Sequence, residues 1–127
     1  MRADAYFYNE EYQKAQRILK EVNSQEPENS DALVKLAICN FKLGNTEDVQ
    51  KNLNSLEGLR APYQFGEIDY GLGQYYAVTG NETELYKYLL KTAAKGHLYH
   101  WKFFKNDPQF KKYNETKAFK EIMNFWK

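Results

Sequence analysis

Residues 36–57 read LAICNFKLGNTEDVQKNLNSLE, and residues 72–93 read LGQYYAVTGNETELYKYLLKTA. Each stretch places a Gly-Asn pair between two segments whose apolar residues recur every three or four positions, and Gly44 and Gly80 lie 36 residues apart. Glycine suits the left-handed residue that ends a helix, and asparagine or threonine can cap the helix that follows. The two stretches therefore predict helical hairpins that repeat along the chain, with a weaker first turn at Asn9-Glu10-Glu11.

The rest of the chain follows the same helical period, and no stretch shows the alternation expected of a half-buried strand. The three prolines, Pro27, Pro62 and Pro108, fall where a helix is expected to begin or end. We therefore predict an all-α fold.

The hairpins resemble the tetratricopeptide repeat (TPR) family, whose pattern has a Leu-small pair in the first helix, glycine at the turn, small or apolar residues in the second helix, and then proline. The matching residues are Leu36, Ala37, Gly44, Val49, Leu53 and Leu56 in one copy, Leu72, Gly73, Tyr76, Gly80, Leu85, Leu89 and Ala93 in another, and Ala15, Leu19, Val22 and Pro27 in a truncated first copy. The resemblance covers about residues 3–95. It implies TPR-like antiparallel helical hairpins, about two and a half repeats, in a right-handed superhelix with C-terminal capping helices.

A chain of 127 residues suits one compact domain. We expect a single TPR-like domain over 1–127, made of a partial repeat (1–27), two repeats (28–62 and 63–96) and a C-terminal cap (97–127). Within the cap, Asp107-Pro108 and Asn114 to Thr116 are helix-start signals. The aromatic side chains expected to cover the last hairpin are Phe103, Phe104, Phe110, Phe119 and Trp126.

Composition excludes several classes of protein. Hydrophobic residues make up 43% of the chain and the net charge is +1, which excludes an intrinsically disordered polypeptide. Cys39 is the single cysteine, so an internal disulfide cannot form. No apolar run approaches the ~20 residues that span a bilayer, and residues 1–13 lack the apolar stretch of a secretory signal. We therefore expect a soluble, cytoplasmic protein without membrane contact.

No combination of residues indicates catalysis, so we expect a protein that is not an enzyme and needs no cofactor. His97 and His100 could share a helix face, but zinc needs three or four ligands and no convincing third is near, so we expect no metal site. Cys39 lies within LAICNF, where a small apolar residue packs well. Gly71-Leu72-Gly73 falls inside a helical stripe and lacks the features of a phosphate loop.

Charge is divided unevenly along the chain. Residues 1–85 carry 8 basic and 14 acidic side chains, whereas residues 86–127 carry 10 lysines and three acidic side chains. The lysines, with Tyr99, Trp101, Phe103 and Phe104 between them, leave open an anion- or nucleic-acid-binding adaptor as an alternative function. We do not favour a nucleic-acid partner, because these residues include no arginine for bidentate phosphate contacts. Head-to-tail self-association of the acidic and basic parts is a further alternative.

The resemblance to TPR proteins implies a concave groove, lined by the first helix of each hairpin, that binds another protein or a peptide. Carried over copy by copy, its lining is Asp4, Phe7 and Tyr8, then Val34, Lys35, Ile38, Phe41 and Lys42, then Glu67, Tyr70, Gln74 and Ala77. The family's basic clamp for a terminal carboxylate is absent, since Glu67 and Gly71 occupy two of its positions. We therefore expect a non-catalytic interaction module or scaffold with an apolar and aromatic groove for a peptide or helix. Two alternatives stay open: these side chains pack against one another, or the chain is the terminal cap of a longer TPR solenoid.

Overall fold

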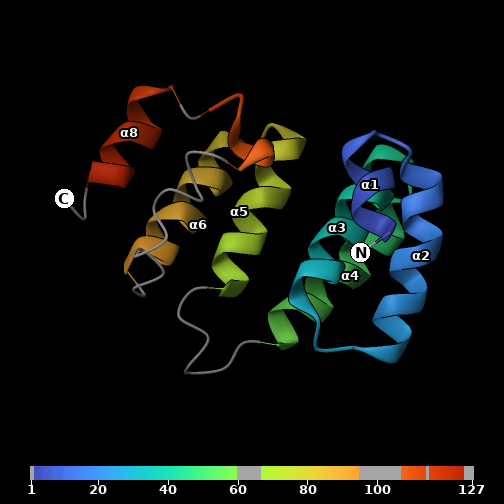
Figure 1. The fold of residues 1–127 in the computed structure, drawn as a ribbon. Helices are drawn as coiled ribbons and strands as arrows, with labels where there is room; N and C mark the ends of the chain where they lie inside the picture. Colours follow the sequence, from blue (N-terminus) through green and yellow to red (C-terminus); the bar gives the residue numbers. More distant parts are fainter. Residues whose placement is uncertain (1, 60–66, 95–106, 114, 125–127) are drawn as a thin grey trace. The chain divides into compact units, whose positions relative to one another are not determined.

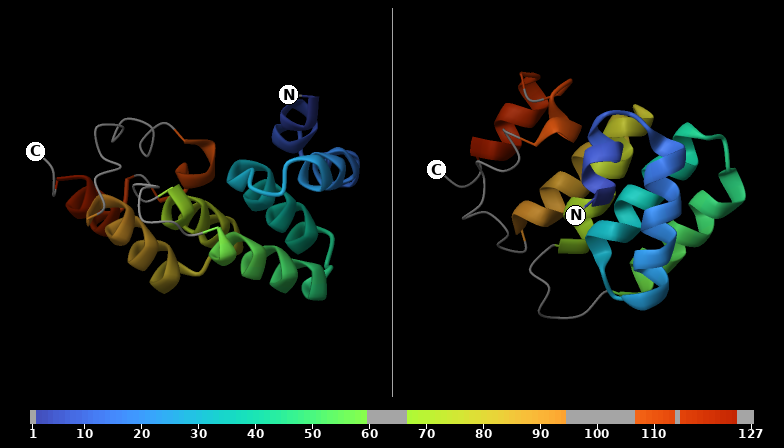
Figure 2. Two further views of the ribbon diagram at one scale, coloured as in Figure 1. Left: turned by 90° about the horizontal axis from the view of Figure 1, so that it is seen from below. Right: turned by 45° about the vertical axis from the view of Figure 1, so that its right-hand side comes forward.

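The computed structural model describes residues 2–59, 67–94, 107–113 and 115–124. The chain divides into two compact units, Met1–Arg60 (unit 1) and Ala61–Lys127 (unit 2). Within the described residues every regular element is a helix, as Figures 1 and 2 show, so the predicted all-α class is confirmed. The division after Arg60 falls close to the repeat boundary predicted after Pro62, which itself lies outside the described residues.

Unit 1 consists of four consecutive helices: α1 (Arg2–Tyr8), α2 (Tyr12–Gln25), α3 (Ser30–Lys42) and α4 (Thr46–Gly58). Each helix packs against the next along the chain, so α3 lies between α2 and α4 (Figure 2). Every side chain from Ala32 to Asn40 is buried, because α3 contacts neighbours around most of its circumference. Helix α3 is therefore the central element of unit 1.

The three turns predicted from the sequence have the same backbone conformation. Gly44 and Gly80 both adopt φ +80°, and Glu10 adopts φ +63° at the corresponding place after α1. Each turn is closed by a hydrogen bond from the backbone N–H after the left-handed residue to a carbonyl five positions earlier: Glu11 to Tyr6 (2.8 Å), Asn45 to Asn40 (2.8 Å) and Asn81 to Tyr76 (3.1 Å). This is the Schellman geometry that ends a helix, and its recurrence confirms the hairpin repeat, including the weak first copy.

The asparagines after the glycines do not all act as caps. The side chain of Asn81 accepts a hydrogen bond from the Glu84 backbone N–H at 3.3 Å, as predicted. Asn45 makes no side-chain cap. Its amide instead donates to Asn40 Oδ1 at 3.4 Å, because that buried oxygen belongs to an amide chain that crosses unit 1.

This amide chain links three helices of unit 1. Gln16 of α2 donates to Asn40 Oδ1 at 2.6 Å, and Asn40 of α3 donates to Asn52 Oδ1 of α4 at 2.7 Å. Asn40 is 1% exposed, so these bonds satisfy polar atoms that water does not reach. These amide hydrogen bonds therefore hold α2, α3 and α4 together and also fix their register.

Unit 2 consists of the hairpin α5 (Glu67–Thr79) and α6 (Glu82–Ala94), the short 3-10 helix η2 (Pro108–Phe110) and α8 (Lys117–Asn124). Helix η2 packs on α5, and α8 packs on α6. Both helix starts predicted for the cap are confirmed: Asp107 Oδ1 accepts from the Gln109 N–H at 2.9 Å, and Thr116 Oγ1 accepts from the Phe119 N–H at 3.2 Å.

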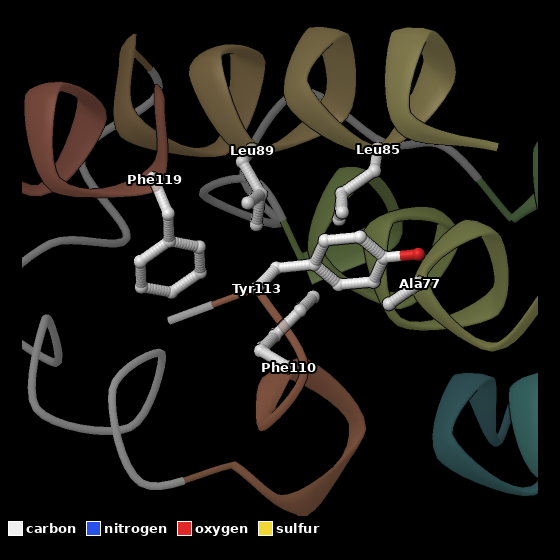
Figure 3. Packing of buried hydrophobic residues seen from close by; sticks show 6 residues of the cluster. All are labelled: Ala77, Leu85, Leu89, Phe110, Tyr113 and Phe119. Carbon is white, nitrogen blue, oxygen red and sulfur yellow. The ribbon is translucent and has the colours of Figure 1, made fainter. Parts of the chain in front are cut away.

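The core of unit 2 joins the hairpin to the C-terminal segment. Figure 3 shows Phe110, Tyr113 and Phe119 packed against Leu85, Leu89 and Ala77 of the hairpin. Phe110 and Phe119 are at most 1% exposed, which confirms the covering role predicted for them. Phe103, Phe104 and Trp126, predicted to do the same, lie outside the described residues.

Candidate partner-binding surfaces

The structure divides the predicted groove residues of unit 1 by burial. Phe7, Val34 and Ile38 are 4%, 3% and 1% exposed, so they pack inside the unit and do not line an open surface. For these three residues the burial favours the alternative that they pack against other side chains of the unit. Tyr8 and Phe41, by contrast, are 49% and 39% exposed.

Lys35, predicted as a cation of the groove, is 8% exposed and bridges two carboxylates. Its Nζ lies 2.7 Å from Asp4 Oδ1 of α1 and 2.9 Å from Asp31 Oδ2 of α3, and 5.6 Å from the centroid of the Tyr8 ring. Burial acts to lower the pKa of the ammonium, but the hydrogen bonds to Asp4 and Asp31 outweigh it and raise the pKa above its ordinary value. Lys35 thus attaches α1 to α3.

The exposed members of the predicted set lie at matching ends of two helices. Tyr8 is the last residue of α1, two positions before the left-handed Glu10. Phe41 and the exposed Lys42 end α3, just before Gly44. The buried Phe7 holds the ring of Tyr8 in an edge-on contact with a centroid distance of 5.1 Å. We name Tyr8, Phe41 and Lys42 the unit-1 aromatic surface.

In unit 2 the structure brings together Tyr70 and Gln74, which are four residues apart on α5. Both donate to the same atom, Oδ2 of Asp107, from the Tyr70 hydroxyl at 2.5 Å and from Gln74 Nε2 at 2.7 Å. The predicted groove face of α5 is therefore occupied by the chain's own C-terminal segment. This role of Asp107 is not predicted from the sequence, which indicates a helix cap at this position. Phe110, three residues later, is the signal for a segment that packs on the hairpin.

Phe110 completes this contact. Its side chain is fully buried, and its ring meets Tyr70 edge-on at a centroid distance of 5.6 Å. A Cβ at Gly73 would lie 3.8 Å from Phe110 and 3.4 Å from Leu89, so the glycine leaves contact room for both side chains, in accord with the expected close helix packing. Ala77, predicted to line the groove, belongs to the same core and is 6% exposed, and Glu67 is exposed at the start of α5.

A scan against protein-family models matches residues 6–60 to the family described as tetratricopeptide repeat. The chain contains a tetratricopeptide repeat. The matched segment includes two of the three turns that share the Schellman geometry, those at Glu10 and Gly44. Searches of curated proteins and of solved structures returned no match. TPR hairpins serve as protein-interaction scaffolds, and this is the class of function that the family match supports.

Three lysines of the lysine-rich segment form local ion pairs. Lys87, Lys117 and Lys120 lie 3.6, 3.8 and 3.0 Å from carboxylates of Glu84, Glu121 and Glu115. The aromatic residues predicted to stack bases, Tyr99, Trp101, Phe103 and Phe104, lie outside the described residues.

Cys39 of the TPR segment is fully buried in α3, and burial raises the pKa of its thiol to about 12. A thiol in this environment stays protonated and suits a packing role.

Gly71-Leu72-Gly73 lies within α5, so it forms no phosphate loop. His97 and His100 lie outside the described residues, and no group of three potential ligands close enough to hold a metal ion occurs among the residues that the structure describes. The described helices include none that is both long and apolar enough to cross a membrane.

Proposed function

We propose that this TPR protein is a non-catalytic interaction module that binds a peptide or a helix of another protein through the unit-1 aromatic surface. The observation that carries the proposal is the exposure of Tyr8 and Phe41, in a set of predicted groove residues whose other aromatic and aliphatic members in unit 1 are buried. Large exposed aromatic side chains are the usual anchors of a protein interface, since they bury much area at a small cost in side-chain entropy.

The neighbouring charges support a partner with an acidic flank. Lys42 is exposed beside Phe41, whereas the carboxylates of Asp4 and Asp31 are engaged by Lys35. A partner that inserts an apolar side chain against Phe41 can therefore pair a carboxylate with Lys42. This arrangement fits an amphipathic helix or an extended peptide with one apolar stripe.

The test compares capture from source lysate by the wild type, Phe41→Glu and Leu90→Glu, with and without nuclease. Leu90 is a matched control, because it is 48% exposed and lies on α6 of the other unit. The proposal predicts a protein that is retained by the wild type and Leu90→Glu, lost with a folded Phe41→Glu, and indifferent to nuclease.

Retention by folded Phe41→Glu would remove the proposal. Loss of all captured material on nuclease treatment would instead support the anion-binding alternative, which also predicts affinity that falls steeply with salt. Unfolding of Phe41→Glu would show that Phe41 is a core residue, and Tyr8→Ser then provides the second variant of the same surface.

A further inference from the structure

The contact between α5 and residues 107–110 has two anchors, an acidic side chain and an aromatic one. Asp107 uses both carboxylate oxygens, since Oδ1 accepts from the Gln109 N–H while Oδ2 accepts from Tyr70 and Gln74. Phe110, three residues later, is fully buried beside Tyr70 and Gly73. Pro108, between the anchors, is exposed, and Gln109 is half-buried. Fixed anchors separated by exposed residues are the usual pattern of peptide recognition.

The donors on α5 select for a carboxylate. A tyrosine hydroxyl and a glutamine amide converge on one oxygen atom, which an ionised carboxylate accepts more strongly than a neutral group does. The aromatic side chain packs directly on α5, since a Cβ at Gly73 would already lie at contact distance from Phe110 (3.8 Å) and the Tyr70 ring meets Phe110 edge-on. The site thus specifies an acidic residue followed three positions later by an aromatic residue.

Residues 107–110 and α8 are attached to the hairpin at different places. Helix η2 packs on α5, whereas α8 packs on α6. The C-terminal attachment has its own contacts, including the Tyr86 hydroxyl 2.9 Å from Thr116 Oγ1 and the Tyr86 and Tyr113 rings edge-on at 6.4 Å. Phe110 also meets the ring of Phe119 in α8 at a centroid distance of 6.0 Å. Departure of residues 107–110 from α5 therefore breaks this ring contact but leaves the Tyr86–Thr116 bond in place.

We propose that the face of α5 formed by Tyr70, Gly73 and Gln74 is a second peptide-recognition site, which the chain occupies with its own Asp107–Phe110 segment. Its ligand in another protein is a peptide with the same chemistry, an acidic residue and an aromatic residue three positions apart. The tethered segment acts as an intramolecular competitor, with an effective concentration on the order of millimolar. The inference does not depend on the unit-1 aromatic surface.

The test measures binding of a labelled synthetic peptide, NDPQFKKY (residues 106–113), to the full chain. Asp107→Asn in the full chain keeps a cap acceptor for Gln109 but removes the charge that Tyr70 and Gln74 recognise, so the tethered segment is weakened while α5 is intact. We expect the peptide to bind this variant about tenfold more tightly than the wild type, the change that corresponds to ~1.4 kcal/mol. The matched control is Lys111→Ala, an exposed position next to the segment, which is expected to bind as the wild type does.

Specificity is tested with the peptides in which Asp is changed to Asn or Phe to Ala, both of which should lose binding. Adding Gln74→Ala to the Asp107→Asn chain should weaken binding of the unmodified peptide to that chain. The proposal is overturned if the folded Asp107→Asn chain shows no saturable binding, or if the altered peptides bind as well as the original. In either case the segment is a cap only.

If Asp107→Asn does not fold, the wild type answers the same question. With millimolar unlabelled peptide, the proposal predicts that the backbone amide signal of Gln109 moves in NMR spectra while that of Gln50 in α4 of unit 1 does not. A Gln109 signal that stays in place at saturating peptide, or both signals moving together, would overturn it.

Discussion

The same turn geometry recurs at three positions of the chain, with φ between +63° and +80°, and gives a quantitative test of the fold. At Gly44, φ is +80° and a Cβ would meet no atom within 4 Å. The substitution Gly44→Ala therefore adds no clash, and its whole effect is the cost of placing an L-residue in the left-handed region.

That cost is roughly 1–2 kcal/mol, and the lower entropy of the unfolded alanine chain offsets about 0.4–1 kcal/mol of it. We expect Gly44→Ala to lower the free energy of unfolding by about 1 kcal/mol. Glu10→Gly should act in the opposite direction by a similar or smaller amount, since Glu10 already bears this cost at φ +63°. Gly58→Ala is the matched control. Gly58 ends α4 at an ordinary φ, and an added Cβ would again meet no atom within 4 Å. This substitution should raise the free energy of unfolding by about 0.5 kcal/mol.

The measurement is urea unfolding followed by far-UV circular dichroism. With a slope of about 2 kcal/mol per molar urea, a change of 1 kcal/mol moves the midpoint by about 0.5 M. Opposite signs for Gly44→Ala and Gly58→Ala are the expected result. A Gly44→Ala chain as stable as the wild type, or a Glu10→Gly chain clearly less stable, would refute the left-handed turns and with them the repeat of hairpins.

Further predictions concern single side chains of unit 1. Asn40→Ala leaves Gln16 and Asn52 without their buried partner and should lower the free energy of unfolding by about 2–3 kcal/mol, measured by urea unfolding; a loss below about 0.5 kcal/mol would contradict the amide chain. Cys39 should not react with iodoacetamide at about pH 8 until the chain unfolds, because burial raises its pKa to about 12; rapid alkylation of the native chain would contradict this. The folded-state pKa of Lys35 is raised, so its contribution to stability is full below the unfolded pKa of about 10.4 and is lost as pH rises through the folded value. Lys35→Met should therefore lower stability at neutral pH and flatten the alkaline decline, and an unchanged decline in pH-dependent unfolding would show that the ion pairs do not contribute.

The repeat of hairpins could be predicted from the sequence because the turns have strict chemical requirements. Gly44 and Gly80 mark left-handed residues that other side chains avoid, and their spacing gives the period. Glu10 was harder to interpret, since nothing in its side chain signals a positive φ; only its place one period before Gly44 does. Asp107-Pro108 likewise predicts a helix start from local chemistry alone.

The surfaces could not be predicted to the same extent, because burial depends on neighbours that are distant in sequence. Val34 and Ile38 carry the apolar pattern of a groove wall and of a core equally well, and only packing around α3 decides that they are core. Lys35 reads as a surface cation, yet Asp4 reaches it from 31 residues away. The joint recognition of Asp107 by Tyr70 and Gln74 is also a tertiary contact that no local motif announces.

The most direct test of the central claim, that this protein captures a partner through the unit-1 aromatic surface, is site-specific photocrosslinking. A photoreactive phenylalanine analogue is placed at Tyr8 in one chain and at Leu90 in another, two positions with nearly equal exposure. The account predicts a protein crosslinked from position 8 in lysate, not from position 90, and displaced by excess unlabelled wild type but not by excess folded Phe41→Glu. Equal crosslinking from both positions, or displacement by folded Phe41→Glu as effective as that by the wild type, would contradict it.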